Sequence, residues 1–304
     1  MFDKIIGNEL AKKTLKKAVD LNKISHSYMF VGISGIGKRL IAKEFAKMIL
    51  CTSKTKYCNR CKSCIEFDSN NNPDFHFIEP DNGSIKINQI RDMQKEVSEK
   101  PIISKNKVCI INDADLMTTE AQNCLLKTLE EPPEYTTIIL IGTNESDFLP
   151  TIKSRCTIKY FERIKQEEIK KFLEDNYKEQ IIKKNIIEIS DGSIWKAIKL
   201  KDKAEIYENL NIIIENLEKR DIIDMIKKAD SLYKTKEEIF EQLEYINVLL
   251  IKKSKINYKY ANCIQIVEET KKRINANSNY NMCIDYMLLG MWEEVNEKYN
   301  RSKI

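Results

Sequence analysis

Short apolar runs alternate with helical patterns along the first half of the chain. Five runs predict buried strands, at residues 28–31, 75–78, 108–111, 138–141 and 157–161. Helices are expected over residues 1–19, over 38–50, where apolar side chains share one face, and over 119–130, before Pro132 and Pro133. This alternation predicts a parallel sheet with helices on both faces.

The second half of the chain has a purely helical pattern. All six prolines lie at or before Pro150, and only Gly192 and Gly290 of the eight glycines follow it. Few breakers and long 3.6-residue periodicity predict helices. We place them at 166–176, 181–190, 194–201, 203–219, 221–231, 236–253, 258–275 and 280–298.

One glycine loop lies between the first strand and its helix, in the segment YMFVGISGIGKRL at 28–40. Gly32, Gly37 and Lys38 have phosphate-loop spacing, and Gly35 adds a third glycine. Backbone N–H groups of such a loop, with the dipole of the next helix, favour an anion. Arg39 stands where the pattern has the Ser or Thr that binds Mg²⁺. The phosphate loop is therefore degenerate.

The segment VCIINDAD at 108–115 departs from the nucleotide pattern in the same way. A phosphate-loop ATPase ends this strand with an Asp that helps to hold Mg²⁺, and a following acid orients the attacking water. Asn112 and Asp113 occupy those two positions. A neutral amide cannot balance a divalent cation, so the metal loses a partner on each side. Hydrolysis of ATP with Mg²⁺ is not expected, and nucleotide binding stays open.

Four cysteines close together in the sequence predict a metal centre, with ligands Cys51, Cys58, Cys61 and Cys64. Four thiolates satisfy tetrahedral Zn²⁺ and leave no open position, which indicates a structural site. An iron–sulfur cluster is the alternative. His76 is expected to be a strand residue and not a ligand. The scattered cysteines are expected to be small buried hydrophobes; they are Cys109, Cys124, Cys156, Cys263 and Cys283.

Composition excludes few further classes. Hydrophobic residues make up 42% of the chain and charged residues 32%, which is typical of a globular protein. There is no run that suits a membrane span and no signal-peptide pattern, so a cytoplasmic protein without membrane partners is expected. The net charge of +5 is only a weak indication of nucleic acid, since the lysines are spread along the chain.

Four segments together identify a family resemblance. HSYMFVG (26–32), the CxxCxxC segment, LLKTLEEPP (125–133) and IKSRC (152–156) occur in this order. The chain resembles the bacterial clamp-loader subunits of the AAA+ class, strongly over the first 200 residues or so. The resemblance implies a RecA-like α/β domain over 1–162 with a zinc module inserted at about 51–64. It also implies an all-α lid over 163–203 and an all-α collar over 204–304 that joins a five-subunit ring.

The resemblance also implies residue roles. Ser154, Arg155 and Cys156 are similar to the arginine finger that family members supply in trans to a neighbour's ATP. Trp195 replaces a lid arginine of the ATP-hydrolysing members. With Arg39 and Asn112, this implies a non-hydrolysing, stator-like subunit that is not an enzyme on its own. The implied partners are the motor subunits (gamma/tau) and the delta subunit, and through them the sliding clamp and primer–template DNA.

Two other functions stay open from the sequence. The chain could be an active motor-type ATPase with unusual metal ligands, which turnover by the purified protein would reveal. It could also be a zinc-dependent DNA-binding protein on an AAA+ scaffold, for which strong salt-dependent DNA binding is the test.

Overall fold

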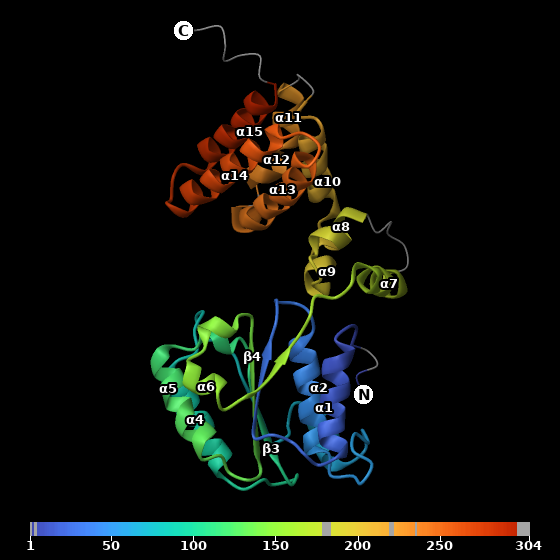
Figure 1. Cartoon of the computed structure of the whole chain (residues 1–304), viewed down its shortest axis with the longest axis vertical. Coiled ribbons are helices and arrows are strands. Elements are labelled where there is room, and N and C mark those ends of the chain that lie inside the picture. The colour runs from blue at the N-terminus through green and yellow to red at the C-terminus, as the bar shows by residue number, and fades with distance from the viewer. Residues whose placement is uncertain (1, 3–4, 178–183, 219–221, 235, 297–304) are drawn as a thin grey trace. The chain divides into compact units, whose positions relative to one another are not determined.

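The computed structural model describes residues 2, 5–177, 184–218, 222–234 and 236–296. The chain divides into two compact units, which are described separately below (Figure 1). The first comprises residues 1–182 with 190–196, and the second comprises 183–189 with 197–304. In the described residues, no helix is long and apolar enough to cross a membrane. Whether residues 163–203 form a domain of their own stays a prediction.

A five-stranded sheet lies at the centre of the first unit, in the order β2-β3-β4-β1-β5. Every neighbouring pair is parallel. The strands are β1 (Ser27–Val31), β2 (Phe75–Ile78), β3 (Lys107–Ile111), β4 (Thr136–Gly142) and β5 (Thr157–Tyr160). All five predicted strands are confirmed. Residues of β1, β3 and β4 are buried throughout, as expected for strands covered on both faces.

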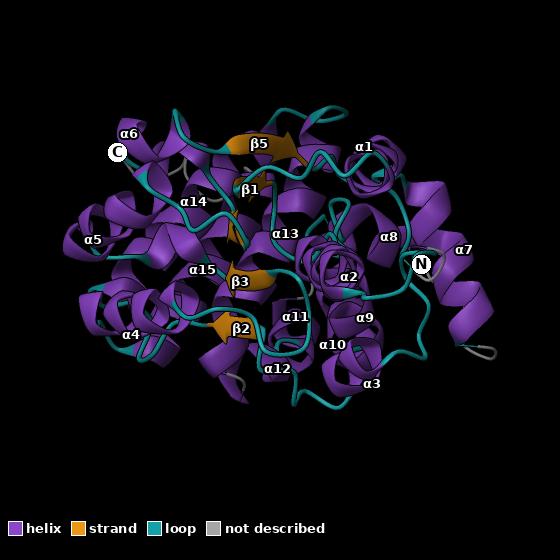
Figure 2. Cartoon of the chain, turned by 90° about the horizontal axis from the view of Figure 1, so that it is seen from below, coloured by secondary structure: helices purple, strands orange, loops and turns teal. Residues whose placement is uncertain are grey.

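Helices cover both faces of this sheet (Figure 2). On one face lie α1 (Glu9–Asp20) and α2 (Lys38–Leu50), with α3 (Lys62–Asp68) beside α2. On the other lie α4 (Ile87–Ser98) and α5 (Thr119–Glu130), with α6 (Pro150–Lys153) beside α5. Short 3₁₀ turns, η2 (Ala114–Leu116) and η3 (Glu145–Asp147), follow β3 and β4. Helix α7 (Gln166–Asn176) completes the first unit, at the predicted bounds.

The N-terminal helix is shorter than expected. The prediction of a helix over residues 1–19 is wrong for residues 5–8, because α1 begins only at Glu9. Gly7 and Asn8 have φ angles of 71° and 55°, in the left-handed region where a right-handed helix cannot continue.

The second unit is entirely helical over its described residues. It contains α8 (Lys184–Ile189), α10 (Ala204–Glu215), α11 (Ile222–Lys228), α12 (Asp230–Lys234), the 3₁₀ turn η4 (Lys236–Glu238), α13 (Ile239–Ser254), α14 (Lys259–Asn275) and α15 (Tyr280–Asn296). The helix α9 (Ile194–Asp202) spans the division between the units. The helical character is confirmed, although the helix predicted over 221–231 is two, since α11 ends at Lys228. Parts of three predicted helices, at 181–183, 219–221 and 297–298, lie outside the described residues.

Candidate functional site

The phosphate loop leaves the carboxyl end of β1 and enters α2, as predicted. A Cβ at Gly32 would lie 2.6 Å from the carbonyl oxygen of Phe161, so no other residue fits without a shift of the backbone. Gly37 is the N-cap of α2 with a φ of 92°, a conformation that favours glycine. These two glycines are therefore required by the path of the loop itself.

The lysine of the loop is bonded to the loop. The Lys38 ammonium donates to the carbonyl oxygens of Ile33, at 2.8 Å, and of Gly32. Burial lowers the pKa of Lys38 to about 8, although the nearby Asp115 and Asp113 carboxylates act in the opposite direction. The group that would contact a nucleotide phosphate already has two acceptors inside its own loop.

Arg39 lies against the end of the edge strand β2. Its Nη1 is 2.5 Å from Glu79 Oε1, and its guanidinium carbon lies 4.5 Å from the centroid of the Phe77 ring. Both charged side chains are about half-exposed. The side chain that replaces the metal-binding hydroxyl is thus held by a carboxylate and an aromatic ring of this chain.

The polar residues after β3 and β4 also bond to one another. Asn112 Nδ2 donates to Asp113 Oδ2 at 2.9 Å. The Asp115 carboxylate accepts the backbone N–H of Thr143 at 2.8 Å and the Thr143 hydroxyl. Burial and the neighbouring Asp115 raise the pKa of Asp113. Asp115 therefore binds the residue expected at a γ-phosphate sensor position.

Residues at the start of α9 pack directly on the phosphate loop. The backbone N–H of Trp195 donates to the carbonyl oxygen of Gly35 at 3.3 Å. A Cβ at Gly35 would overlap Ser193 Oγ and lie 2.9 Å from Trp195 Cβ. Ser193 is buried, whereas the Trp195 indole is exposed. Gly35 thus serves a contact between loop and helix, and its φ of 78° also favours glycine.

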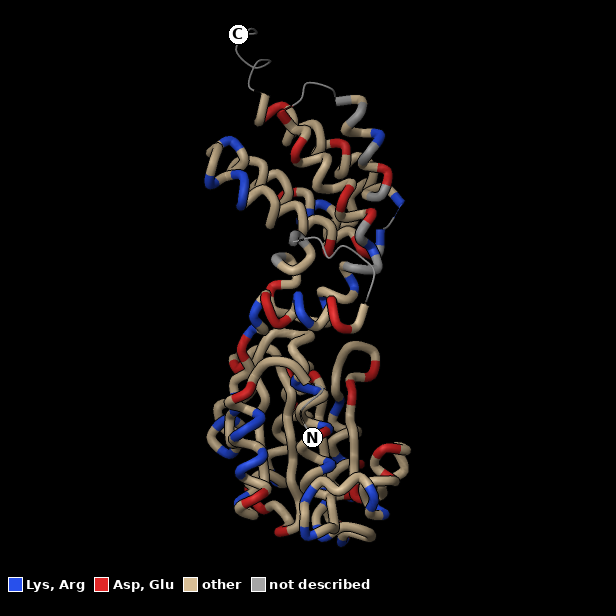
Figure 3. The backbone as a smooth tube through the Cα atoms, turned by 90° about the vertical axis from the view of Figure 1, so that its right-hand side faces the viewer, with Lys and Arg blue, Asp and Glu red and all other residues tan. Residues whose placement is uncertain are grey.

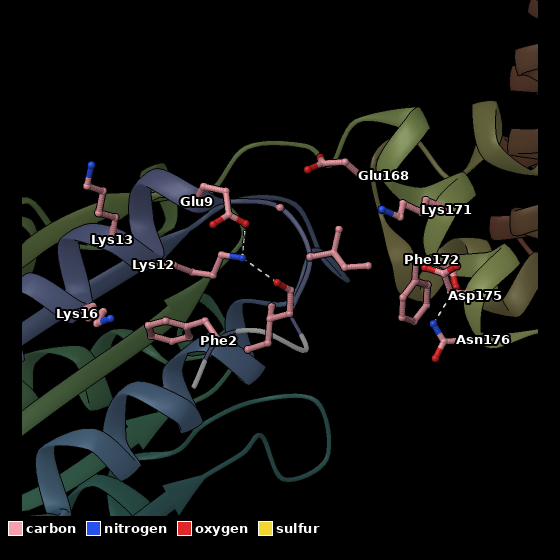
Figure 4. Close-up of a pocket in the computed structure, with 13 residues that line it drawn as sticks. Phe2, Glu9, Lys12, Lys13, Lys16, Glu168, Lys171, Phe172, Asp175 and Asn176 are labelled. Atoms are coloured by element: carbon pink, nitrogen blue, oxygen red, sulfur yellow. Dashed lines mark hydrogen bonds and ion pairs between the residues drawn. The ribbon is translucent and has the colours of Figure 1, made fainter. Parts of the chain in front are cut away.

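A cavity of about 1420 Å³ lies between α1 and α7 in the same unit (Figure 4). The aromatic rings of Phe2 and Phe172 face it from opposite sides. Its buried cation, Lys12, is bonded to the Ile5 carbonyl oxygen at 2.7 Å and to Glu9. Ile5 joins the cavity to the phosphate loop, because its Cγ2 lies 3.5 Å from a Cβ placed at Gly37.

The candidate finger Arg155 lies just before β5, in the turn after α6. Its Nη2 is 2.8 Å from Glu130 Oε1. Its Nη1 donates to the Thr151 carbonyl oxygen at 2.8 Å and to Ser154 Oγ at 3.3 Å. The Ser27 hydroxyl donates to the carbonyl oxygen of Arg155, which ties the turn to β1. The neighbouring Cys156 is an inward-facing thiol, and burial raises its pKa to about 11.

The four predicted metal ligands are brought together. The sulfur atoms of Cys51, Cys58, Cys61 and Cys64 all lie within 4.8 Å of one another. The Cys51 sulfur is 3.7 Å from that of Cys58 and 4.0 Å from that of Cys61. Four sulfurs at 2.3 Å from a tetrahedral ion are separated by about 3.8 Å, so the spacing fits one ion. A cluster of several irons would hold the thiolates farther apart.

Local structure explains how this cysteine cluster forms. Cys61 is the N-cap of α3 and Cys64 lies in its first turn. The backbone N–H of Cys61 points at the Cys58 sulfur, at 3.3 Å. An ion pair of 2.6 Å between Lys47 and Asp68 joins α2 to the end of α3. His76 lies in β2, as predicted, and does not belong to the cluster.

A buried polar network fastens the cysteine module to the sheet. The Asp74 carboxylate accepts the backbone N–H groups of residues 102–104 at 2.6–2.8 Å. The Ser104 hydroxyl bonds to the Leu50 carbonyl oxygen and to the Ser63 hydroxyl, each at 2.9 Å. Leu50 and Ser63 directly precede two of the cysteines. The module and the loop after α4 therefore form one connected structure.

Comparisons with known proteins assign this arrangement to a family. A family model described as "DNA polymerase III, delta subunit" matches residues 7–165. The delta' subunit of Bacillus subtilis DNA polymerase III is 33% identical over 215 residues, which are 68% of this chain and 64% of that protein. The chain therefore spans just under two thirds of the length of this relative.

The chain belongs to the clamp-loader subunit family of DNA polymerase III. Its relatives include more than one subunit type, because the gamma subunit of Buchnera aphidicola is 30% identical over 86% of this chain and 74% of that protein. A gamma subunit-related protein of Thermotoga maritima shares the fold, with a TM-score of 0.52 at 19% identity over 94% of this chain and 99% of that one. The fold is the RecA-like α/β fold of AAA+ proteins followed by helices.

Sequence reasoning found the clamp-loader site residues but missed their partners. Glu79, Glu130 and the Asp115–Thr143 pair lie far along the chain from what they bind or follow a different strand. The sequence contains one signal for Glu130, its place in LLKTLEEPP, which recurs with the SRC segment in order. Nothing in the sequence shows that these two motifs meet.

Proposed function

We propose that the chain is the delta-prime-type, non-hydrolysing subunit of the clamp loader. Clamp-loader relatives include both hydrolysing and delta-prime types, so the choice rests on the nucleotide site. The observation that carries it is the double loss of metal partners at Arg39 and Asn112. Each replacement is bonded to a carboxylate of this chain, Glu79 and Asp113 respectively. Such a site lacks the ligands that hold Mg²⁺ against the phosphates.

In this proposal the chemistry takes place in a neighbouring motor subunit of the gamma/tau type. Arg155 approaches the γ-phosphate of that neighbour's ATP and stabilises charge in the transition state. A planar guanidinium suits phosphate oxygens better than an ammonium does. The helices of residues 204–304 join the ring with the motor and delta subunits, which act on the sliding clamp and primer–template DNA.

The cysteine cluster would hold one structural zinc ion. Four protein thiolates complete the coordination, so no position is open for a substrate. The module has a mechanical role, since it is joined through Ser63 and Ser104 to the loop that Asp74 holds. Basic and acidic positions are interspersed over the described backbone (Figure 3), which does not favour the DNA-binding alternative.

The test is ATP turnover by a clamp loader reconstituted from this chain and its partner subunits with clamp and primed DNA. Arg155→Ala is expected to lower turnover about tenfold or more, because fingers contribute roughly 10³–10⁵ in known cases. Arg60→Ala, at an exposed arginine of the cysteine module, is the matched control. Unchanged turnover with Arg155→Ala excludes the finger. Turnover by the isolated chain at a motor-like rate would instead identify an active ATPase.

A further inference from the structure

We infer that Glu130 is the residue that positions Arg155 for the neighbouring subunit. This inference rests on the proposed finger role of Arg155 and assigns a function to the acidic end of α5. Glu130 is the last residue of α5, and its Oε1 lies 2.8 Å from Arg155 Nη2. The pair joins the LLKTLEEPP segment to the SRC segment.

The Arg155 side chain is held from two elements. Glu130 contacts Nη2 from α5, while the Thr151 carbonyl oxygen and the Ser154 hydroxyl accept from Nη1 at the end of α6. A guanidinium is a rigid plane with five N–H donors, so contacts at both terminal nitrogens fix its orientation. Its backbone is held separately, since the Ser27 hydroxyl donates to the Arg155 carbonyl oxygen.

The held arginine is still accessible to an anion. The Arg155 side chain is 33% exposed and that of Glu130 is 51% exposed. An exposed ion pair of this kind contributes little to the stability of a fold. Its consequence is that Arg155 meets an incoming phosphate already oriented, with fewer torsions left to fix. Donors that are oriented in advance stabilise developing charge more effectively than mobile ones.

The next residue offers a matched control. Glu131 is an exposed carboxylate one position farther along, and it caps α5 through its backbone N–H, which donates to the Lys127 carbonyl oxygen. Glu130→Gln and Glu131→Gln remove the same charge from adjacent positions. Only the first removes the carboxylate that contacts Arg155. A general effect of surface charge on assembly or on phosphate binding would be shared by both variants.

The experiment measures clamp- and DNA-stimulated ATP turnover by the reconstituted complex, with kcat and KM determined separately. Glu130→Gln is expected to lower kcat on the order of tenfold, because misplacement of a catalytic group by about 1 Å can cost up to 10² in rate. KM should stay unchanged, since the motor subunit itself binds the nucleotide. Glu131→Gln should behave as wild type, and all variants should assemble and melt like it.

A double variant separates positioning from a merely structural role. In an Arg155→Ala background, Glu130→Gln should have no further effect on kcat, because the group that it positions is gone. If Arg155→Ala lowers turnover but Glu130→Gln equals Glu131→Gln, the positioning role is wrong and the finger stands. If Arg155→Ala changes nothing, the finger itself is wrong. An increase in kcat with Glu130→Gln would mean that Glu130 restrains Arg155, which also overturns the inference.

Discussion

His76 lies in the edge strand β2 with a half-buried ring. Burial lowers its pKa below the ordinary value of 6.5; Lys107 adds to this, and Glu96 and Asp74 oppose it. The folded chain therefore favours the neutral ring, and the unfolded chain binds the proton more readily. Stability should consequently fall as the pH drops through about 6.5. We expect a lower urea midpoint at about pH 5.5 than at about pH 7.5.

The contribution of His76 can be isolated by substitution. His76→Gln has no ring to titrate, so it should lose less stability than wild type over the same pH interval. The only other histidine of the chain, His26, is exposed and provides the control. His26→Gln should keep the pH dependence of wild type. Equal pH dependence in wild type and His76→Gln would contradict this assignment.

Gly35 combines backbone strain with a close contact, and Gly83 separates the two effects. Both have positive φ, 78° and 80°, but among described residues nothing lies within 4 Å of a Cβ at Gly83. Gly83→Ala should cost only the strain, about 1 kcal/mol. Gly35→Ala should cost about 2–4 kcal/mol in unfolding free energy, because Ser193 must also move. Equal costs in chemical denaturation would show that the loop does not depend on α9.

At the residue scale, sequence patterns predicted which positions depart from an ATPase but not where the side chains lie. The pattern marks Arg39 because a hydroxyl is missing there. Its partner Glu79 comes 40 residues later, and no periodicity connects them. Such pairs depend on the strand order, which places β2 at the edge beside β3. The quartet is different, because its ligands are close in sequence and their spacing alone predicts the cluster.

Among the elements, the cysteine module should depend most on a bound ion. Its chain between α2 and α3 contains Tyr57 and Asn59 at positive φ and has little regular structure. Binding energy for a structural ion is therefore folding energy. Elemental analysis should give about one zinc per chain, since four thiolates complete one tetrahedral site. Removal by a chelator should lower the melting temperature by about 10 °C and increase hydrogen exchange over residues 51–72.

Two cysteine variants check that prediction. Cys58→Ser should lose the metal and reproduce the effect of the chelator. Cys124→Ser, outside the quartet, should retain it. Iron with visible absorption in place of zinc would contradict a single-ion site, and so would unchanged hydrogen exchange after the metal has been removed.

Element prediction from sequence succeeded where the apolar pattern was strong. The strands and the helices α2, α5 and α7 have their predicted ranges within a few residues. Helices α3 and α4 were not predicted, and both are rich in polar residues. The buried positions of α4, Ile90, Met93 and Val97, have helical spacing, but they are the only fully buried side chains of its twelve residues. Tertiary packing against β3 and α5, invisible in one sequence, stabilises this helix.

At the scale of the whole molecule, the chain has two separate hydrophobic cores. One joins the sheet to α4 and α5 and includes Met29, Ile111 and Leu125. The other lies among the helices of the second unit and includes Ile246 and Met287. All residues of each core belong to one unit. Each unit buries enough apolar surface to unfold as a cooperative body of its own.

The two tryptophans of the chain make this independence measurable. Trp195 belongs to the first unit and Trp292 to the second. In Trp292→Phe, fluorescence follows the first unit alone, and its thermal transition should move to lower temperature when a chelator removes the metal. In Trp195→Phe, fluorescence follows the second unit, whose core is distant in sequence from the quartet, and its transition should not move. One coincident transition that shifts with the chelator in both variants would mean that the units unfold together. In that case loss of the ion would reach the proposed collar through α9, the helix shared by the units.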